Sequence, residues 1–254
     1  MPAMSHTLER SLDILDCLAA DDEPLRLSQL ADRIGTERSN TLRLLRCLEA
    51  RGYVERDEFK RYSLGLTALR LARVVLRRLD VAEAGQEVLR ALGHATGEAA
   101  HLAVLQGIHI VYLGRVESAA PVRVTHEVGQ REPAHCTAVG KALLAYLPAS
   151  ELQRLFPAGR LPIHTSHTLS TLRALRHDLG LVRERGYAFD DEELYEGVRC
   201  IAAPVRNHVG TIVASIGVSA PAMRLSAARR ARVAKLVKKH AEELSERLGC
   251  VQTA

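Results

Sequence analysis

The chain has 254 residues, 47 % of them hydrophobic and 26 % charged, which is typical of a soluble globular protein. This length predicts two domains, each able to bury a core. The excess of 35 Lys and Arg over 30 Asp and Glu gives a net charge of +5, which suits an anionic partner without requiring one.

No apolar run approaches the ~20 residues of a membrane-spanning helix, and the N-terminus has no secretory signal pattern. The five cysteines form no CxxC pair, which favours a reducing compartment. We therefore expect a cytoplasmic protein with no membrane partner.

The N-terminal quarter of the chain predicts a helix-turn-helix. Thr7–Ala20 reads as an amphipathic helix with Leu8, Leu12, Leu15 and Leu18 on one stripe. Leu27–Arg56 then holds two short helical patterns around Gly35, a residue that enters sharp turns without a Cβ penalty. Thr36 is the expected N-cap of the second helix, Gly52 its end, and Tyr53-Val54 the start of a strand.

The second helix of this motif carries side chains that read bases. Arg38, Ser39, Asn40 and Arg43 lie on its outward side; Arg pairs with guanine and Asn with adenine in the major groove. Further candidates for holding the DNA are Ser28, Arg46, Arg56, Lys60 and Arg61. The alternative is an ordinary helical hairpin whose arginines are merely solvated.

A hairpin and a connecting helix follow. Gly52–Leu64 predicts a β-wing with its turn at Asp57–Lys60. Gly65–Leu79 predicts a linker helix with apolar Leu66, Leu69, Val74 and Leu76 and a set of arginines, Arg70, Arg73, Arg77 and Arg78. We place the domains at residues 1–64 (winged helix-turn-helix), 65–79 (linker helix) and 80–254 (a second, larger domain).

The C-terminal part predicts an α+β domain. Val81–Thr96 is helical, and strands are expected in residues 101–106, 109–116 and 121–128, with a loop at Gly129–Pro133. Helices follow at Thr137–Tyr146, at Ser150–Phe156 capped by Ser150, and at Leu169–Glu184 capped by Thr168 or Ser170. The remaining elements are strands at 187–190, 199–206 and 211–219 and a terminal helix, 225–248, whose basic side chains we expect to be solvated. This order suits an antiparallel sheet flanked by helices.

The segment His135–Lys141 attracts several interpretations. Adjacent residues on an extended segment point to opposite faces, so His135 and Cys136 should not form a nucleophilic dyad. A phosphate loop fails because Ala142 follows Lys141 where Ser or Thr is needed. A small-molecule pocket remains, with Thr137 and the amides of Ala138, Val139 and Gly140 at a helix start that suits a carboxylate. The alternative is a tight helix–sheet junction that needs small residues for packing alone.

Metal ligation is an alternative for His135, Cys136, Cys200 and the acidic run Asp190–Glu193, but no ligand spacing is diagnostic and no metal or cofactor is expected. A cysteine-dependent hydrolase or transferase using Cys136 or Cys200 is one alternative function. A regulator that senses redox state or metal through those cysteines is another.

The chain resembles the IclR family of bacterial transcriptional regulators over nearly its full length. The N-terminal segments that carry the resemblance are Ser11–Leu18, Leu27–Arg56 and Arg61–Gly65; the C-terminal ones are His135–Leu147, Arg183–Val205 and Val213–Pro221. The three C-terminal segments, in that order and spacing, are the specific part, since many regulator families share a winged helix.

The resemblance implies a winged helix, a linker helix and a GAF-like effector-binding domain, without catalytic activity. It implies dimers or tetramers on palindromic operators, an organic acid or aromatic catabolite as effector, and RNA polymerase as a further candidate partner. It also implies that the pocket is lined by Ala138-Val139, Asp190, Cys200, Gly217 and Ser219. Some relatives carry a hydroxyl where Gly217 stands, so this chain lacks one donor there.

Overall fold

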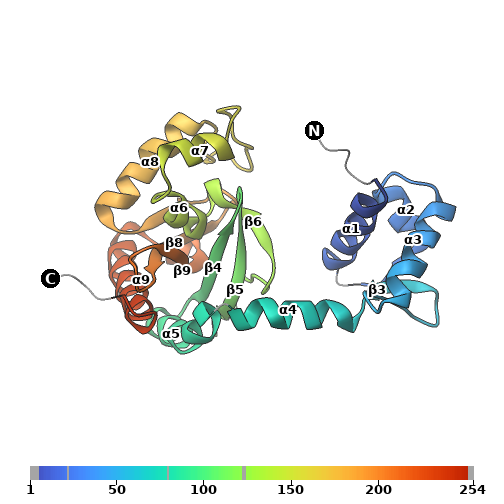
Figure 1. The fold of residues 1–254 in the computed structure, drawn as a ribbon. Helices are drawn as coiled ribbons and strands as arrows, with labels where there is room; N and C mark the ends of the chain where they lie inside the picture. Colours follow the sequence, from blue (N-terminus) through green and yellow to red (C-terminus); the bar gives the residue numbers. More distant parts are fainter. Residues whose placement is uncertain (1–5, 22, 79, 122–123, 251–254) are drawn as a thin grey trace. The chain divides into compact units, whose positions relative to one another are not determined.

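The computed structural model describes residues 6–21, 23–78, 80–121 and 124–250 (Figure 1). The chain divides into two compact units, residues 1–79 and 80–254, which are described separately. Among the described helices, none is both long and apolar enough to cross a membrane.

The N-terminal unit is a winged helix-turn-helix. Its helices are α1 (His6–Ala19), α2 (Leu27–Arg33) and α3 (Arg38–Ala50). The strands β1 (Leu25–Arg26), β2 (Val54–Arg56) and β3 (Arg61–Leu64) pair antiparallel in the order β1-β3-β2. The core is made of apolar side chains from every one of these elements: Ile14, Leu18, Leu25, Leu30, Leu44, Leu45, Val54 and Tyr62. The predicted motif and wing are confirmed.

Two local predictions in this unit are wrong. The N-cap of α3 is Glu37, not Thr36, because the turn from Gly35, at φ +62°, takes one more residue before the backbone becomes helical. The leucine stripe of α1 also packs against the core only in its second half, at Leu15 and Leu18. Leu8 and Leu12 are 60 % and 51 % exposed, whereas Ile14 and Leu18 enter the core.

Helix α4 (Leu66–Arg78) leaves the wing. A Cβ at Gly65 would lie 2.3 Å from the Gly52 carbonyl oxygen, so only glycine lets the chain pass here. Leu66 and Leu69 are 72 % and 65 % exposed. The side chains from residue 73 to residue 80, which include predicted apolar and basic positions of this helix, lie outside the described residues.

The C-terminal unit is built on a six-stranded antiparallel sheet. The strand order is β6-β5-β4-β9-β8-β7. Their bounds are β4 (Ala99–Gln106), β5 (His109–Val116), β6 (Arg131–Pro133), β7 (Ala188–Asp191), β8 (Val198–Arg206) and β9 (Ile212–Pro221). The α+β class and the antiparallel sheet with flanking helices are confirmed.

Helices cover both faces of this sheet (Figure 1). Helices α5 (Asp80–Thr96) and α9 (Ala227–Arg247) pack on one face, against each other. The short helix α6 (Ala138–Leu144) lies on the other and is backed by α8 (Leu172–Arg185), with α7 (Ala149–Leu155) nearby. Ser215 Oγ donates to the Val139 carbonyl at 2.9 Å, which ties α6 to the middle of the sheet.

The strand after β5 is not where the sequence pattern placed it. Residues 124–128 form no strand and Val122-Arg123 lie outside the described residues, whereas the predicted loop contains β6. The reason is the turn ending at Gly129, φ +88°, which delivers Arg131–Pro133 to the edge of β5. Pro133 is tolerated because an edge strand leaves some amides unpaired.

Helix starts in this unit also differ from the predicted ones. Helix α8 is capped by Thr171, whose side chain accepts from Ala174 N, and Pro148 occupies the N-cap position of α7 without a side-chain hydrogen bond. The predicted cap residue Thr168 instead accepts hydrogen bonds from the amides of His164 and Thr165 in the loop before α8. Each predicted cap was a hydroxyl residue close to the true start, so pattern alone located the helix but not its first turn.

The basic residues near α9 are not all solvated. Arg224 and Arg229 both bind the carboxylate of Glu98, at 2.6 and 2.9 Å, and Glu98 is only 1 % exposed. A buried carboxylate needs such partners, since an unpaired buried charge is costly. These two arginines therefore hold the α5–β4 connection to the start of α9.

Candidate functional site

The predicted base-reading residues lie together on α3. Arg38, Ser39 and Arg43 are exposed, and Asn40 is half-buried, while Leu44 and Leu45 of the same helix enter the core. The Arg43 guanidinium donates to Asn40 Oδ1 at 3.1 Å. Arginine and asparagine thus form one connected polar surface on the exposed side of the helix, and Arg46 extends it by one turn.

The wing offers a second basic surface. Arg56 and Lys60 are exposed, Lys60 at the tip with φ +61°. Arg61 is engaged within the wing, because its Nε donates to Asp57 Oδ2 at 2.7 Å while its backbone amide donates to Asp57 Oδ1. Ser28, the remaining predicted contact, is half-buried at the start of α2.

Three predicted pocket residues form a row across neighbouring strands. Asp190 of β7 stands opposite Cys200 of β8, which stands opposite Ser219 of β9. Cys200 Sγ and Ser219 Oγ are 3.1 Å apart. Thr137, Ala138 and Val139 at the start of α6 line the same cavity as Asp190 and Cys200. The sheet register brings Asp190, Cys200 and Ser219 together, and the start of α6 closes the same cavity from the face of the sheet.

Two predicted pocket residues, Gly140 and Gly217, lie where the backbone is too close to leave room for a side chain. A Cβ at Gly140 would lie 2.2 Å from the Ala134 carbonyl oxygen, and one at Gly217 would lie 2.5 Å from that of Ile201. A hydroxyl side chain does not fit this backbone at Gly217. Gly140 instead donates its amide to Thr137 Oγ1 at 3.3 Å, which caps α6 and leaves the amides of Ala138 and Val139 without a helix-internal acceptor.

The pocket also contains polar residues that the sequence analysis missed. They come from β4, β5, β6, the segment before β6 and the segment between β7 and β8: His101, Tyr112, His126, Glu132 and Tyr195. The His101 and His126 rings pack edge to face at 5.1 Å, and Tyr112 stacks on His126 at 4.6 Å. Alternation along β4 and β5, with His101 and Tyr112 facing inward, was the available signal; Glu132 was hidden in a segment read as a loop.

Glu132 is the charged centre of this group. Its Oε2 accepts from Tyr112 at 2.7 Å and its Oε1 from Tyr195 at 3.2 Å, while His126 Nδ1 lies 3.5 Å away. Burial raises the pKa of Glu132, but the nearby His126 ring and the hydrogen bonds from Tyr112 and Tyr195 outweigh burial and leave that pKa below its usual value. Glu132 is therefore ionised at neutral pH.

Asp190 behaves in the opposite way. Burial, opposed by the hydrogen bond that Oδ1 accepts from Glu193 N at 2.8 Å, raises the pKa of Asp190 to about 7. Burial also lowers the pKa of His101 well below its usual value. His101 Nδ1 has no hydrogen-bond partner in the described structure. At neutral pH the pocket thus presents a half-protonated acid and a neutral imidazole with an unused nitrogen.

The pocket is nearly closed. Its cavity is about 10 Å³, roughly the room for one water molecule. Leu194 and Tyr195, in the segment between β7 and β8, form part of its wall. A ligand larger than water enters only if part of the lining moves.

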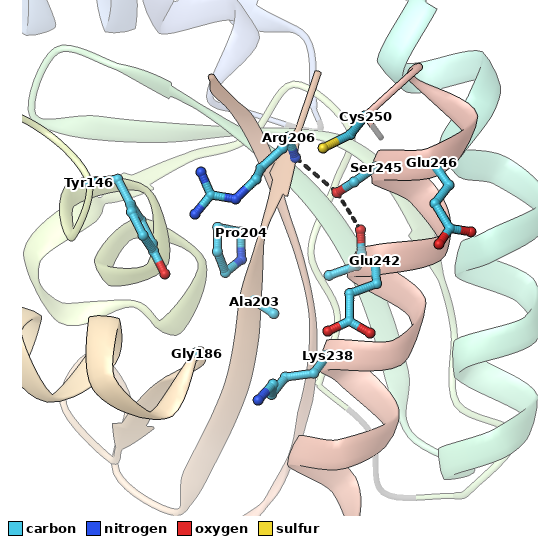
Figure 2. A pocket seen from close by; sticks show the side chains of 11 residues that line it. Tyr146, Gly186, Ala203, Pro204, Arg206, Lys238, Glu242, Ser245, Glu246 and Cys250 are labelled. Atoms are coloured by element: carbon cyan, nitrogen blue, oxygen red, sulfur yellow. Dashed lines mark hydrogen bonds between the residues drawn. The ribbon is translucent and has the colours of Figure 1, made fainter. Parts of the chain in front are cut away.

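A larger groove of about 230 Å³ lies elsewhere, between the end of β8 and α9 (Figure 2). Several of its polar groups already have partners. The backbone amide of Arg206 donates to Ser245 Oγ at 2.9 Å, its side chain stacks on Tyr146, and Lys238 donates to the Arg185 carbonyl at 3.3 Å. Because no buried polar group in it lacks a partner in the described residues, we prefer the smaller cavity as the ligand site.

Lys141 has a structural role. Its ammonium group is 1 % exposed and binds Glu193 and, at 2.9 Å, Asp178. Burial lowers the pKa of Lys141, but the attraction of these two carboxylates exceeds this effect and raises that pKa overall. The lysine is therefore charged and locks α6 to α8 and to the segment after β7.

The buried cysteines make poor nucleophiles. Burial and the nearby charge of Asp190 raise the pKa of the Cys136 and Cys200 thiols well above the usual value. Since the thiolate is the reactive form, little of either is available at neutral pH. The electrostatics thus favour a binding pocket over a cysteine active site.

Comparison with known proteins identifies both units. Residues 7–58 match the model of the IclR helix-turn-helix domain, and residues 73–246 match that of the bacterial transcriptional regulator IclR C-terminal domain. The chain is 38 % identical over 239 residues to the HTH-type transcriptional regulator BhcR of Paracoccus denitrificans, covering 94 % of this chain and 85 % of that one.

It is 32 % identical over 244 residues to the HTH-type transcriptional regulator XynR of Escherichia coli, with 96 % and 97 % covered. Among solved structures, the IclR protein of Thermotoga maritima superimposes with a TM-score of 0.76 at 30 % identity, over 96 % of this chain and 98 % of that one. The winged helix, the helix-covered sheet and these matches agree: the chain belongs to the IclR family and is a DNA-binding transcriptional regulator whose action responds to a small molecule.

Proposed function

We propose that this regulator binds a palindromic operator as a homodimer through α3 and the wing of each copy, and that a small hydroxylated carboxylate in the pocket of residues 80–254 sets its affinity for that operator. The observation that carries the effector part is the convergence of unused polar groups on one cavity beside ionised Glu132. Residues 1–64 are then the DNA-binding domain and 65–79 the linker. As a DNA-binding protein it acts in the cytoplasm.

On DNA, each surface of the N-terminal unit has a distinct role. Arg38, Ser39, Asn40 and Arg43 read base edges from α3, since the major groove is wide enough to admit an α-helix. Phosphates are held by residues on its margin and on the wing: Ser28, Arg46, Arg56, Lys60 and Arg61. Of these we give Arg61 the smallest share, because Asp57 already occupies its guanidinium.

A second copy of the chain accounts for the exposed leucines of the N-terminal unit. Leu8 and Leu12 of α1 and Leu66 and Leu69 of α4 are each more than half exposed. Each such side chain gains ~1.5–3 kcal/mol when it is fully removed from water, so four per copy favour self-association. A palindromic operator matches this two-fold symmetry. We further propose that two such dimers associate into a tetramer and that the bound protein contacts RNA polymerase.

The chemistry of the pocket suggests the class of effector. The free amides of Ala138 and Val139 are donors suited to a carboxylate. His101 Nδ1 and the Asp190 carboxyl are acceptors that suit a hydroxyl on the same molecule. Glu132 repels a second negative charge. These groups favour a small monoanion with at least one hydroxyl over a dicarboxylate.

Effector binding is coupled to the shape of the pocket. A ligand needs much more room than about 10 Å³, so it favours an arrangement in which the Leu194-Tyr195 wall has moved. A ligand changes DNA affinity only by as much as its affinities for the two arrangements differ. The linker helix α4 is the only covalent connection from residues 80–254 to the winged helix-turn-helix. A small change in its angle therefore shifts one of the two DNA-binding domains of a dimer relative to its half-site, where half-sites lie ~34 Å apart.

The test is an operator titration on full-length protein. A thermal-shift screen of small hydroxy acids, aromatic acids and dicarboxylates first finds ligands, and the best one is then added to the titration at saturation. We expect a change in operator affinity, and none with a scrambled duplex. The proposal fails if the best ligand leaves both operator affinity and promoter output unchanged.

We further infer that the protein is not an enzyme. The buried, protonated thiols support this, because a hydrolase or transferase needs a reactive thiolate. A Cys200→Ser variant separates the ideas. If the protein is a regulator, this variant should keep DNA binding and respond differently to the ligand. If the native chain instead turns over the screened acids and the variant does not, the protein is an enzyme.

A further inference from the structure

His135 and Cys136 lie on a single turn of 3₁₀ helix, η1 (Ala134–Cys136), and not on the extended segment that the sequence predicted. Three residues complete each turn of such a helix, so neighbouring side chains diverge by ~120° and not by ~180°. A third side chain, His164, arrives from the loop between α7 and α8. One ligand atom of each residue lies within 4.8 Å of the others.

We propose that His135, Cys136 and His164 bind one divalent cation of the zinc class. Two imidazoles and one thiolate are ligands that zinc prefers, and three protein ligands leave the fourth tetrahedral position to a water molecule. As the metal–sulfur bond forms, the thiol proton leaves to solvent, because a coordinating cysteine is deprotonated. Among the described residues this is the one group of three that meets the distance.

The hydrogen bonds of His135 prepare it for this role. Its Nε2 lies 2.9 Å from the Pro162 carbonyl oxygen, which only accepts, so Nε2 carries the proton. Nδ1 therefore keeps the unshared pair that a metal requires. Metal-binding histidines characteristically donate their other N–H to a backbone carbonyl in this way, which fixes the ring.

The three residues also have the right burial. His135 and Cys136 are 2 % and 0 % exposed, whereas His164 is exposed. Ligand atoms around zinc lie ~3.5 Å apart, given bonds of ~2.0–2.3 Å, so the group must contract by about 1 Å. The exposed His164 ring can supply this by rotating. The Cys136 thiol is lightly held, since its contact with the Pro133 carbonyl is 3.9 Å long.

The backbone beside His164 is firmly placed. The amides of His164 and Thr165 donate to Thr168 Oγ1 at 3.0 and 2.9 Å, and that hydroxyl donates to the Glu193 carbonyl. The loop is thus tied to the segment that follows Asp190, while Cys136 directly precedes Thr137 of the pocket. An ion bound here would connect the segment before α6 to the loop that is tied to the segment after β7, and both of these segments adjoin the cavity.

Cobalt(II) provides the test, because a thiolate bound to it gives a near-ultraviolet charge-transfer band. Full-length protein treated with a chelator is titrated with cobalt and then with zinc. We expect one ion per chain, with the band displaced by zinc and missing in Cys136→Ser. We also expect at least tenfold weaker binding in His164→Ala. His167→Ala, an exposed histidine of the same loop, and Cys47→Ser, an exposed cysteine, are the matched controls and should bind like the native chain.

Two outcomes overturn the proposal. One is a native chain that shows no charge-transfer band at a cobalt concentration of 1 mM. The other is a band whose intensity and affinity are the same in His164→Ala as in the native chain. Because His164 is exposed, this variant should fold even if Cys136→Ser does not, so the second outcome is always measurable.

Discussion

The buried acid of the pocket should make the C-terminal unit less stable as pH rises. The pKa of Asp190 is about 7 in the folded chain against an ordinary value of 3.8, so the folded state binds this proton more tightly than the unfolded state. The contribution of Asp190 to the free energy of unfolding therefore falls between about pH 4 and about pH 7. The folded and ordinary pKa values of Asp190 differ by about three units, and each unit corresponds to about 1.4 kcal/mol. Ionisation of Asp190 therefore lowers the free energy of unfolding by up to ~4 kcal/mol at pH 8 and by almost nothing at pH 4.

Asp190→Asn removes this dependence. The amide has nearly the same shape and its oxygen still accepts from Glu193 N, but it has no proton to lose. Relative to the native chain, we expect the variant to be about equally stable at pH 4.5 and more stable by ~2–4 kcal/mol at pH 8. Urea unfolding followed by circular dichroism at several pH values measures this, using the transition of the C-terminal unit.

Asp191→Asn is the matched control for this measurement. Asp191 is next in sequence, lies on the other side of β7, and binds Arg199 at 2.6 Å. It should give no stabilisation that grows with pH. A constant stability difference between Asp190→Asn and the native chain from pH 4.5 to pH 8 would refute the account of Asp190.

Three further substitutions test the DNA-binding head, the second copy and the pocket wall. Arg43→Ala should weaken operator binding by ~1–3 kcal/mol relative to a scrambled duplex in fluorescence anisotropy, and an unchanged ratio would exclude base reading by Arg43. Leu69→Glu should weaken self-association at least tenfold in analytical ultracentrifugation, and unaltered association would remove α4 from the interface. Tyr195→Phe deletes the 3.2 Å hydrogen bond to Glu132 that holds the wall shut, so effector affinity in calorimetry should rise about two- to tenfold; a fall would mean that the Tyr195 hydroxyl binds the effector.

The helix-turn-helix could be predicted from sequence because its signals are local. Apolar residues at helical spacing, one glycine at a turn and a hairpin pattern all lie within Leu27–Leu64. The prediction that failed there was which apolar side chains are buried. Leu8 and Leu12 fit the helical stripe but face away from the core, since the spacing of leucines along a helix cannot distinguish a face covered by the same chain from one that awaits a second copy.

The pocket was only partly predictable because it is assembled by sheet order. Asp190, Cys200 and Ser219 were placed together by the family resemblance, and no spacing indicates that they form one row. Glu132 and Tyr112 join them because β5 pairs with β4 and β6 pairs with β5 at the edge of the sheet. Neither a pairing partner nor the edge position of β6 is encoded within a short window, so the charged centre of the pocket was missed.

The charges of the pocket finally determine how effector binding should respond to pH. A carboxylate that enters beside Asp190 raises the pKa of that residue further, because two like charges in a buried site repel. Binding of an anionic effector therefore takes up a proton whenever Asp190 is ionised beforehand. Since the pKa of Asp190 is about 7 without ligand, affinity should be constant well below pH 7 and should fall above it, by up to tenfold for each pH unit.

Calorimetry with the effector found by screening, at pH 6 and pH 8, measures this fall directly. Repeating the pH 7 titration in buffers of different ionisation enthalpy counts the protons taken up. Asp190→Asn should bind with the same affinity at both pH values, since the amide is neutral throughout. A native chain that binds a monoanion equally well at pH 6 and pH 8, with no proton uptake, would show that the ligand carboxylate sits far from Asp190, and it would move the anion site away from the start of α6.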